Sequence, residues 1–432
     1  MSNTWPIRKL RELADIRVSN VDKKTAPGEK PVKLCNYMDV YSNEYVTGSL
    51  SFMEASATAA EIERFGLNKG DVIITKDSET PDDIGISTVV VEKIDDLVCG
   101  YHLALIRPNA EQLDSIYLAK QLSTSRVARY FSLHASGSTR YGLPISAIEA
   151  VDLPTPSKPE QAKIAEILTT VDRAIEQTEA LIAKQQRIKT GLMQDLLTRG
   201  IDEHGNLRSE QTHQFKDSPL GKIPVEWETK ELRSYLSYLS YGFTNPMPEA
   251  QDGPHMVTAA NVANGFVQYD YCRRTTVEAY EKLLTKKSRP KIGDILITKD
   301  GTLGRLAIVD RLPLCINQSV AVMRPKDGVD NNYLKLLLES PKYQKLILAD
   351  AGGSTIKHIY ISKIAKMVLG VPKGKTEQES IKERLLFQCS LLYQYEANLK
   401  KLRSLKTALM QDLLTGKKRV TGLLNDTEVS NL

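Results

Sequence analysis

The chain has 432 residues, of which 41% are hydrophobic and 26% are charged, and a formal net charge of +5. This composition predicts a globular protein of two to four domains, whose mild basic excess permits nucleic-acid binding without requiring it. It excludes membrane-spanning and disulfide-rich secreted proteins, because no run of about 18 apolar residues occurs and the cysteines are widely scattered. We therefore expect a cytoplasmic protein.

The first 153 residues have the pattern of a mixed domain. Short β-rich runs, such as DVIIT (71–75) and STVVV (87–91), alternate with glycine, aspartate and proline. An amphipathic helical stretch covers residues 113–131. Residues 1–153 are therefore predicted to form a compact α+β domain.

A long helix is predicted next, over residues 154–200. It opens at Pro159-Glu160-Gln161, which suits a helix N-terminus. Apolar residues then recur at alternating steps of four and three, the 3.5-residue period of a coiled coil. This seam comprises Ile164, Leu168, Val171, Ile175, Ile182, Leu192 and Leu196.

Residues 201–371 are predicted to form a polar linker and a second α+β domain, with a strand at DILIT (294–298) and a helical stretch over 332–348 that breaks at Pro341. A second long helix is predicted over 372–416. Its seam comprises Ile381, Leu385, Leu392, Leu399, Leu402, Leu409 and Leu413. The tail, residues 417–432, lacks a strong pattern and is expected to be flexible.

The chain is duplicated with a period above 200 residues. Four blocks recur in the same order: KGDVIITKD (69–77) with IGDILITKD (292–300), Cys99-x-x-His102 followed by Arg107-Pro108 with Cys315-x-x-Gln318 followed by Arg324-Pro325, GSTRYGLPISAI (137–148) with GSTIKHIYISKI (353–364), and KTGLMQDLLT (189–198) with KTALMQDLLT (406–415). So long a period indicates two copies of one domain rather than a solenoid.

The two helical seams match each other, with a lysine at the same step, Lys189 and Lys406. A single helix would leave its apolar seam in water, so we expect the two helices to pack together as an antiparallel coiled coil. The domains are then related by a pseudo-twofold axis. The alternative is that each helix packs only on its own domain.

Six stretches of the chain are distinctive: VKLCNYMDVY (32–41), PSKPEQAKIAEIL (156–168), KTGLMQDLLTRG (189–200), SPLGKIPVEW (218–227), GDILITKDG (293–301) and KTALMQDLLTGKKRV (406–420). In these stretches the chain resembles the specificity subunits of type I restriction-modification systems. The stretches span nearly the whole chain, in the order that the family has.

The resemblance implies a non-catalytic DNA-binding protein with two target recognition domains, each reading one half of a bipartite DNA sequence. It implies that the helices set the gap between the half-sites and dock two methyltransferase subunits. Those partners bind S-adenosylmethionine and methylate adenine, whereas this chain carries no cofactor. In some systems a restriction/translocase subunit joins. Because the halves align poorly over residues 20–50 and 242–280, we expect an asymmetric target.

Two repeated elements are candidates for DNA contact, because short polar and basic side chains beside loop glycines suit phosphate binding. The first is the strand end at Thr75, Lys76 and Asp77, repeated at Thr298, Lys299 and Asp300. The second is the glycine loop with Ser138, Thr139 and Arg140, repeated at Ser354, Thr355 and Lys357. Base-reading residues must lie where the halves differ, and Asn36, Tyr37, Thr258 and Asn261 are named as candidates.

No catalytic constellation is found in the sequence. The segment 370–376 is one residue too short for a phosphate-binding loop, and Asn245-Pro246-Met247-Pro248 lacks the aromatic residue that an amino-methyltransferase needs. The acidic cluster at residues 77–83 is not repeated, and the six histidines are not spaced as metal ligands. A stand-alone nuclease or methyltransferase, and a purely structural coiled-coil adaptor, remain the alternative functions.

Overall fold

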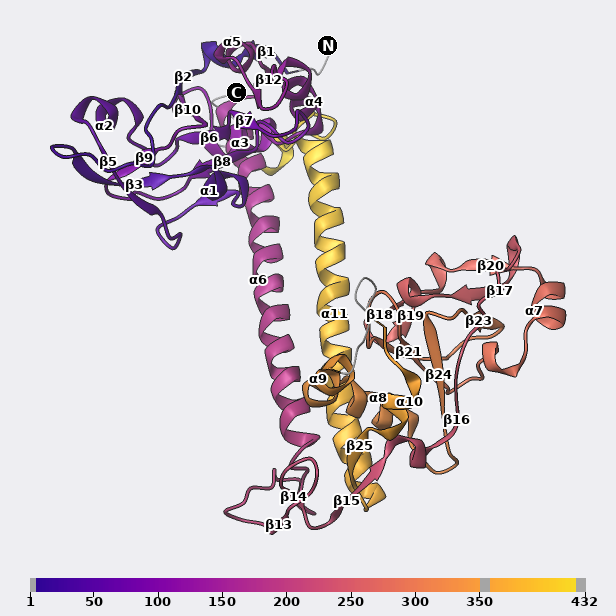
Figure 1. Ribbon diagram of the computed structural model, residues 1–432. Coiled ribbons are helices and arrows are strands. Elements are labelled where there is room, and N and C mark those ends of the chain that lie inside the picture. Colours follow the sequence, from indigo (N-terminus) through magenta and orange to yellow (C-terminus); the bar gives the residue numbers. More distant parts are fainter. Residues whose placement is uncertain (1–4, 350–357, 425–432) are drawn as a thin grey trace. The chain divides into compact units, whose positions relative to one another are not determined.

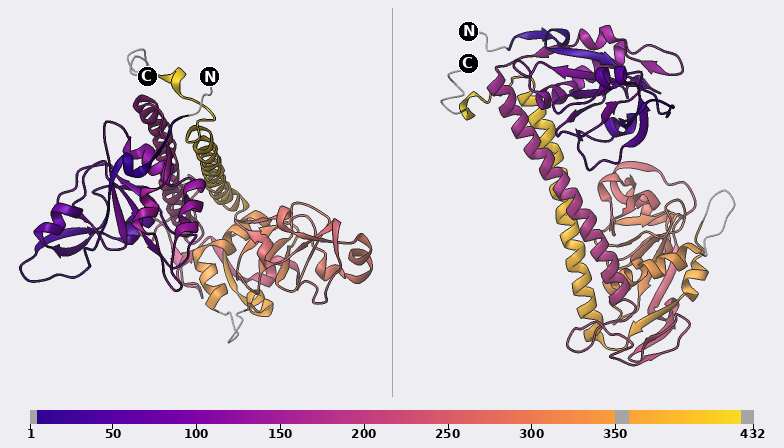
Figure 2. Two further views of the ribbon diagram at one scale, coloured as in Figure 1. Left: turned by 90° about the horizontal axis from the view of Figure 1, so that it is seen from above. Right: turned by 90° about the vertical axis from the view of Figure 1, so that its left-hand side faces the viewer.

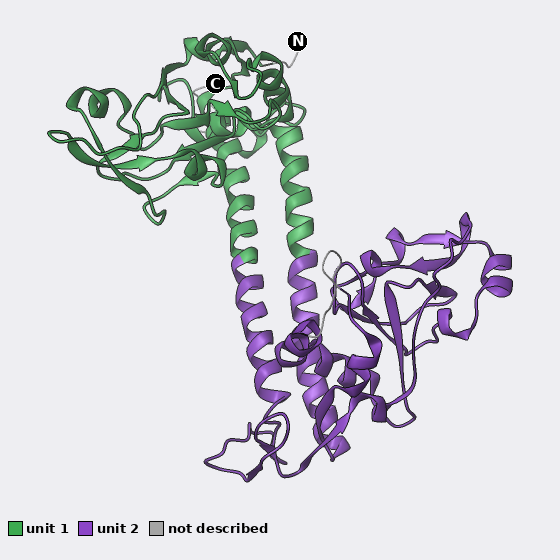
Figure 3. Ribbon diagram, viewed as in Figure 1, with its two compact units in different colours: residues 1–179, 398–432 green, residues 180–397 purple. Residues whose placement is uncertain are grey.

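The computed structural model describes residues 5–349 and 358–424 (Figure 1). It divides into two compact units (Figure 3): unit 1 comprises residues 1–179 and 398–432, and unit 2 comprises residues 180–397. The two long helices, α6 (Lys158–Leu196) and α11 (Lys375–Leu413), each contribute to both units. Each unit therefore combines one globular domain with a part of both helices.

The domain of unit 1 is built on a five-stranded sheet of order β2-β10-β6-β8-β4 and a three-stranded sheet of order β5-β3-β9. All four residues of the inner strand β6 are buried, which suits its apolar sequence VIIT. The strands are β1 (Ile7–Lys9), β2 (Ala14–Val18), β3 (Lys30–Cys35), β4 (Tyr45–Val46), β5 (Met53–Ala57), β6 (Val72–Thr75), β7 (Asp77–Ser78), β8 (Ser87–Val90), β9 (Leu97–Cys99), β10 (Leu103–Pro108), β11 (Tyr141–Gly142) and β12 (Asp152–Pro154).

The helices of this domain are η1 (Leu10–Glu12), α1 (Tyr37–Tyr41), α2 (Ala59–Phe65), α3 (Ser115–Leu122), α4 (Ser125–His134) and α5 (Ile145–Glu149). Asp114 starts α3 by accepting a 2.9 Å hydrogen bond from the Tyr117 N–H. The stretch that we predicted as one helix is two, α3 and α4. The hydroxyls of Ser123 and Thr124 bond to carbonyls of the preceding turn and end the first helix.

The domain of unit 2 has a four-stranded sheet of order β16-β24-β21-β22 and a three-stranded sheet of order β20-β17-β23. Its strands are β13 (Phe215–Lys216), β14 (Ile223–Pro224), β15 (Trp227–Glu231), β16 (Leu236–Tyr241), β17 (Glu249–Val257), β18 (Val262–Ala263), β19 (Phe266–Val267), β20 (Arg273–Thr275), β21 (Ile295–Thr298), β22 (Leu306–Ile308), β23 (Leu314–Ile316), β24 (Val320–Pro325) and β25 (Val368–Pro372).

Its helices are η2 (Leu232–Tyr235), η3 (Ala259–Asn261), η4 (Tyr269–Tyr271), α7 (Val277–Leu283), η5 (Lys286–Ser288), α8 (Asn331–Glu339), α9 (Pro341–Ala349) and α10 (Ile361–Lys366). The predicted break at Pro341 is confirmed, because α8 ends at Glu339 and α9 begins at the proline.

The two domains share one topology. The order β2-β10-β6-β8 in unit 1 matches β16-β24-β21-β22 in unit 2, and each three-stranded sheet contains one parallel pair, β3 with β9 and β17 with β23. An ion pair with a buried aspartate also recurs, since Arg107 binds Asp71 and Arg324 binds Asp294 through two hydrogen bonds each. The fold is therefore a duplicated α+β domain.

In each unit α6 and α11 lie side by side and antiparallel (Figure 1, Figure 2). Arg403 of α11 contacts Glu179 of α6 at 2.6 Å in unit 1, and Gln388 contacts Gln185 at 2.8 Å in unit 2. All fourteen seam residues are buried or half-buried. The alternative, in which each helix packs only on its own domain, does not describe these units.

A short segment after each helix completes a unit. In unit 1 this terminal segment is 414–424: Val420 is buried, and the Arg419 guanidinium binds the fully buried Glu160 carboxylate at 2.6 and 2.8 Å. In unit 2 the connecting segment is 197–226, from which Arg208 binds Glu377. The start of the tail was expected to be flexible, but residues 417–424 include this ion pair and buried side chain. Residues 425–432 lie outside the described part.

Among the described residues, no helix is both long and apolar enough to cross a membrane.

Candidate DNA interface

In unit 1 the predicted strand end and the predicted glycine loop meet, although about 60 residues separate them. Strand β7 (Asp77–Ser78) pairs with β11 (Tyr141–Gly142). The Leu143 N–H also donates a 2.8 Å hydrogen bond to the carbonyl oxygen of Lys76. The repeated sequence blocks thus form one surface of this domain.

Unit 2 brings the corresponding blocks together in the same way. Asp300 forms a β-bridge with His358, and the Ile359 N–H donates to the Lys299 carbonyl oxygen at 2.8 Å. Ser354, Thr355 and Lys357 fall outside the described residues, so their predicted contacts are not placed. The common framework supports a shared role for the two surfaces.

Both threonines of the strand ends are fully buried, which corrects the expectation that they contact DNA. The Thr75 hydroxyl accepts a 3.0 Å hydrogen bond from the Ile86 N–H, and the Thr298 hydroxyl accepts one of 2.9 Å from the Arg305 N–H. Each hydroxyl therefore holds the start of the neighbouring strand and is too deeply buried to contact a DNA phosphate.

The lysine and aspartate after each threonine reach the surface as an ion pair. Lys76 Nζ lies 2.8 Å from Asp77 Oδ1, with 18% and 13% of the side chains exposed. Lys299 Nζ lies 2.8 Å from Asp300 Oδ2 and 5.6 Å from the centre of the Tyr241 ring. These lysine side chains are mostly buried, but their charged ends can still bind a phosphate while they keep their ion pairs with the aspartates.

Asp77 has an additional partner in unit 1, since its Oδ2 lies 2.6 Å from Nδ1 of His102. Burial opposes ionisation of this carboxyl, but hydrogen bonds from Lys76 and His102 outweigh burial and lower its pKa. Asp77 is therefore an ionised acceptor that orients its neighbours.

The glycine loop of unit 1 exposes Ser138, Thr139 and Arg140, as expected of phosphate-contacting side chains. Gly137 has a φ of +144°, and a Cβ there would lie 1.9 Å from the carbonyl oxygen of Arg140. Only glycine can therefore close this loop. The loop holds three donor side chains in solvent next to the Lys76–Asp77 pair.

Sequence reasoning understated the aromatic residues of this surface. The Tyr37 and Tyr41 rings stack with centres 5.6 Å apart, and Tyr101 is 47% exposed. Hydrogen bonding to Asp83 raises the pKa of Tyr41. The sequence contained a signal for this stacking, because side chains four residues apart on a helix, such as Tyr37 and Tyr41, are neighbours.

Of the other base-reading candidates, Asn261 is corrected by the structure. It is buried, its amide donates to the Tyr271 carbonyl oxygen at 2.9 Å, and its oxygen accepts from the Thr258 hydroxyl at 2.9 Å. Both ends of the amide are thus used within the protein.

Acidic side chains also border the unit 1 surface. Glu79 and Asp82 are exposed, and Asp82 accepts a 2.9 Å hydrogen bond from Ser132. Within the described residues, no group of three or more histidine, cysteine, aspartate or glutamate side chains is placed to hold a metal ion. Carboxylates at a DNA surface can accept from cytosine amino groups, so they are compatible with base reading.

Two domains of one topology, each with a lysine–aspartate pair at the end of an inner strand, give the chain two equivalent candidate recognition surfaces. The fold resembles the solved S subunit of a type I restriction-modification system from M. genitalium, with a TM-score of 0.60, 15% identity, and coverage of 96% of this chain and 97% of that one. A structure from work on complex assembly and conformational transition of the type I R-M system gives a TM-score of 0.53 at 16% identity, covering 96% and 98%.

The family described as type I restriction modification DNA specificity domain matches residues 2–185 and 224–386, and the chain belongs to this family. Among curated relatives, the putative type I restriction enzyme MjaX specificity subunit of Methanocaldococcus jannaschii is 23% identical over 429 residues, covering 96% of this chain and 94% of that protein. The EcoBI specificity subunit of Escherichia coli is 24% identical over 240 residues, covering 53% and 50%.

Proposed function

We propose that this chain reads a bipartite, asymmetric DNA target, one half-site with each globular domain, and carries two methyltransferase subunits to that target. The observation that supports this most is the repeated framework of Lys76–Asp77 and Lys299–Asp300, since each lysine is bonded to a turn residue that differs between the units, His102 and Ser319. Shared residues suit the DNA backbone, which is the same everywhere, and divergent residues suit different bases.

The proposal assigns methyl transfer to the partner subunits, which would bind S-adenosylmethionine, and DNA cleavage to a restriction/translocase subunit where one is present. The chain would act in the cytoplasm, where the DNA is. A preparation of the chain alone is expected neither to methylate nor to cut DNA. Methyl transfer that follows the purified chain through successive columns would favour the stand-alone enzyme instead.

The test of the two-reader arrangement is an exchange of residues 20–153 for the matching part of a relative with a different target. The assembled methyltransferase is expected to change one half-site and retain the other, because each domain has its own recognition surface. The methylated motif can be read by sequencing that detects methyladenine. A change in both half-sites, or in neither, would contradict the proposal.

A second expected result concerns phosphate contact by the repeated lysines. Lys76→Ala and Lys299→Ala should each weaken binding to all sequences similarly and lower the slope of log K against log salt by about one unit. Lys93→Ala is the matched control. Because β8 runs antiparallel to β6, Lys93, which follows the last residue of β8, lies at the end of the sheet opposite Lys76. An unchanged slope in both variants, with the fold intact, would remove these lysines from the interface.

A further inference from the structure

The turn between β9 and β10 presents one histidine in an unusual backbone conformation. His102 has a φ of +73°, in the left-handed region that residues other than glycine seldom adopt. Its carbonyl oxygen accepts a 2.8 Å hydrogen bond from the Lys76 N–H. The turn is thereby attached to the strand end that forms the candidate DNA surface, and the surrounding structure maintains the strained residue.

Asp77 determines which nitrogen of the His102 ring is available. Its ionised carboxylate can only accept hydrogen bonds, so Nδ1, at 2.6 Å, must carry the proton. The space for this carboxylate depends on Gly142 of the adjoining strand, where a Cβ would lie 3.0 Å from Asp77 Oδ1. The other ring nitrogen, Nε2, is left as a hydrogen-bond acceptor in the neutral ring.

The ring is supported on one side and open on another. The Tyr101 ring centre lies 4.0 Å from that of His102, and 22% of the His102 side chain is exposed. A neighbouring aromatic ring and a carboxylate together limit the rotation of the imidazole. Such a fixed group with one free polar atom is suited to recognising one hydrogen-bonding position.

Unit 2 attaches the corresponding turn to its strand end in the same way, but with a different side chain. The structural counterpart of His102 is Ser319, whose carbonyl oxygen accepts a 2.8 Å hydrogen bond from the Lys299 N–H. The sequence blocks had matched His102 with Gln318, but an additional residue in unit 2 shifts the register by one. The Ser319 hydroxyl donates to Asn317 at 2.6 Å and accepts from the Ala259 N–H at 2.9 Å, so it is used internally.

We propose that His102 is a specificity-determining residue of the first half-site, whose Nε2 accepts a hydrogen bond from the amino group of an adenine or cytosine in the major groove. These are the bases that present an amino donor there, whereas guanine and thymine present acceptors. The inference rests on the proposed function, and it specifies the class of base that is read and the protein atom that contacts it. Asp77 is the positioning residue, and unit 2 reads its half-site without this contact.

The leading test is His102→Gly, because glycine adopts a positive φ without strain and Asp77 keeps its ion pair with Lys76. The methyltransferase assembled with this variant is expected to accept more than one base pair at a single position of the first half-site. Affinity for the original target should fall by about 5- to 150-fold, the range for loss of a good base contact. The second half-site should be unchanged.

Asp77→Asn tests the positioning role by a different route. The asparagine amide can donate to Nδ1, which would move the ring proton to Nε2 and make that atom a donor. Selectivity should then shift toward guanine or thymine, or relax, at the same base pair that His102→Gly affects. His204→Ala is the control, because His204 is an exposed histidine of unit 2.

The inference is overturned if His102→Gly methylates the original motif with unchanged affinity, or if the altered positions fall in the second half-site. Relaxation at several positions of the first half-site would show that His102 maintains the fold of the surface instead. Exchange of residues 20–153 distinguishes the two proposals. If that exchange changes one half-site and His102→Gly changes none, only the inference about His102 fails.

Discussion

Glu377→Ala is expected to destabilise unit 2 by about 3–5 kcal/mol, the cost of removing one partner from a buried ion pair. The Arg208 and Glu377 side chains are only 7% and 12% exposed. The Glu377 carboxylate also accepts 3.1 Å hydrogen bonds from the Trp227 indole N–H and the Ile201 N–H. Removing it leaves a guanidinium and two N–H donors without their acceptor.

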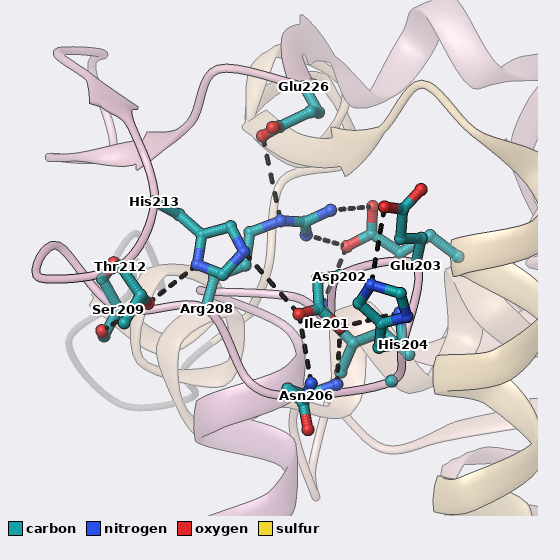
Figure 4. Close-up of polar contacts among 12 residues, drawn as sticks. Ile201, Asp202, Glu203, His204, Asn206, Arg208, Ser209, Thr212, His213 and Glu226 are labelled. Atoms are coloured by element: carbon teal, nitrogen blue, oxygen red, sulfur yellow. Dashed lines mark hydrogen bonds and ion pairs between the residues drawn. The ribbon is translucent and has the colours of Figure 1, made fainter.

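The surroundings of Arg208 offer no equivalent replacement. Figure 4 shows the Arg208 guanidinium within the loop from Ile201 to His213, with Glu226 on one side. The nearest Glu226 oxygen is 3.9 Å from Arg208 Nε, beyond hydrogen-bonding distance. Gly200 leaves the space that the Glu377 carboxylate occupies, because a Cβ at residue 200 would lie 2.2 Å from a carboxylate oxygen of Glu377.

Urea unfolding followed by tryptophan fluorescence measures this effect. The chain has two tryptophans, and in a Trp5→Phe background the remaining Trp227, 1% exposed, reports on unit 2. Glu210→Ala is the matched control, because Glu210 and its partner Lys222 are 61% and 57% exposed and should contribute less than about 1 kcal/mol. Equal stability losses in the two variants would contradict the role given to Glu377.

The architecture could be predicted from the sequence because its signals are local. The 3.5-residue spacing of apolar residues predicts a paired helix without knowledge of the partner, and the long-period repeat predicts two copies of one fold. The proline at 341 likewise determines a helix end from one position. The structure has the antiparallel helices and two matching sheet orders that these patterns indicate.

The site was less predictable because it depends on contacts between distant segments. In the sequence Thr75 looks like an exposed polar residue at a strand end. In the structure its hydroxyl is buried and accepts a hydrogen bond from the N–H of Ile86, 11 residues later. His102 looked like a scattered histidine, and only the fold places it 2.6 Å from Asp77. The one-residue shift that aligns His102 with Ser319 is visible only in the backbone hydrogen bonds.

The helix seams contain one more feature that the sequence shows only in part. A lysine interrupts both seams, but the sequence does not reveal what it binds. In unit 1 Lys406 of α11 lies 2.7 Å from Asp172 of α6, and Asp172 also lies 2.5 Å from Lys120 of the globular domain. The Tyr45 hydroxyl donates to the same carboxylate at 2.6 Å. Asp172 therefore connects both helices to the recognition domain.

Asp172→Ala is expected to destabilise unit 1 by about 3–5 kcal/mol, since Lys120 is only 5% exposed and would retain only Glu44 as an ion-pair partner. In the repeat, Cys389 of α11 occupies the position in unit 2 that Asp172 of α6 occupies in unit 1. Cys389→Ala is therefore the matched control, and it should lower the stability of unit 2 by about 1 kcal/mol. Amide hydrogen exchange can measure both: Asp172→Ala should accelerate exchange in α3 and leave α8 unchanged. Similar acceleration in both helices would contradict a local role.

The same carboxylate makes the stability of unit 1 depend on pH. Burial opposes ionisation of Asp172, but the Lys120 charge and hydrogen bonds from Lys120, Lys406 and Tyr45 outweigh it and lower the pKa. Because the folded pKa lies below the unfolded value of about 3.9, the stabilisation is complete above that value and is lost as the pH falls through the folded pKa. Asp172→Asn should therefore flatten the acid limb of the unit 1 stability curve. A limb of unchanged steepness in this variant would assign the acid sensitivity to other carboxylates.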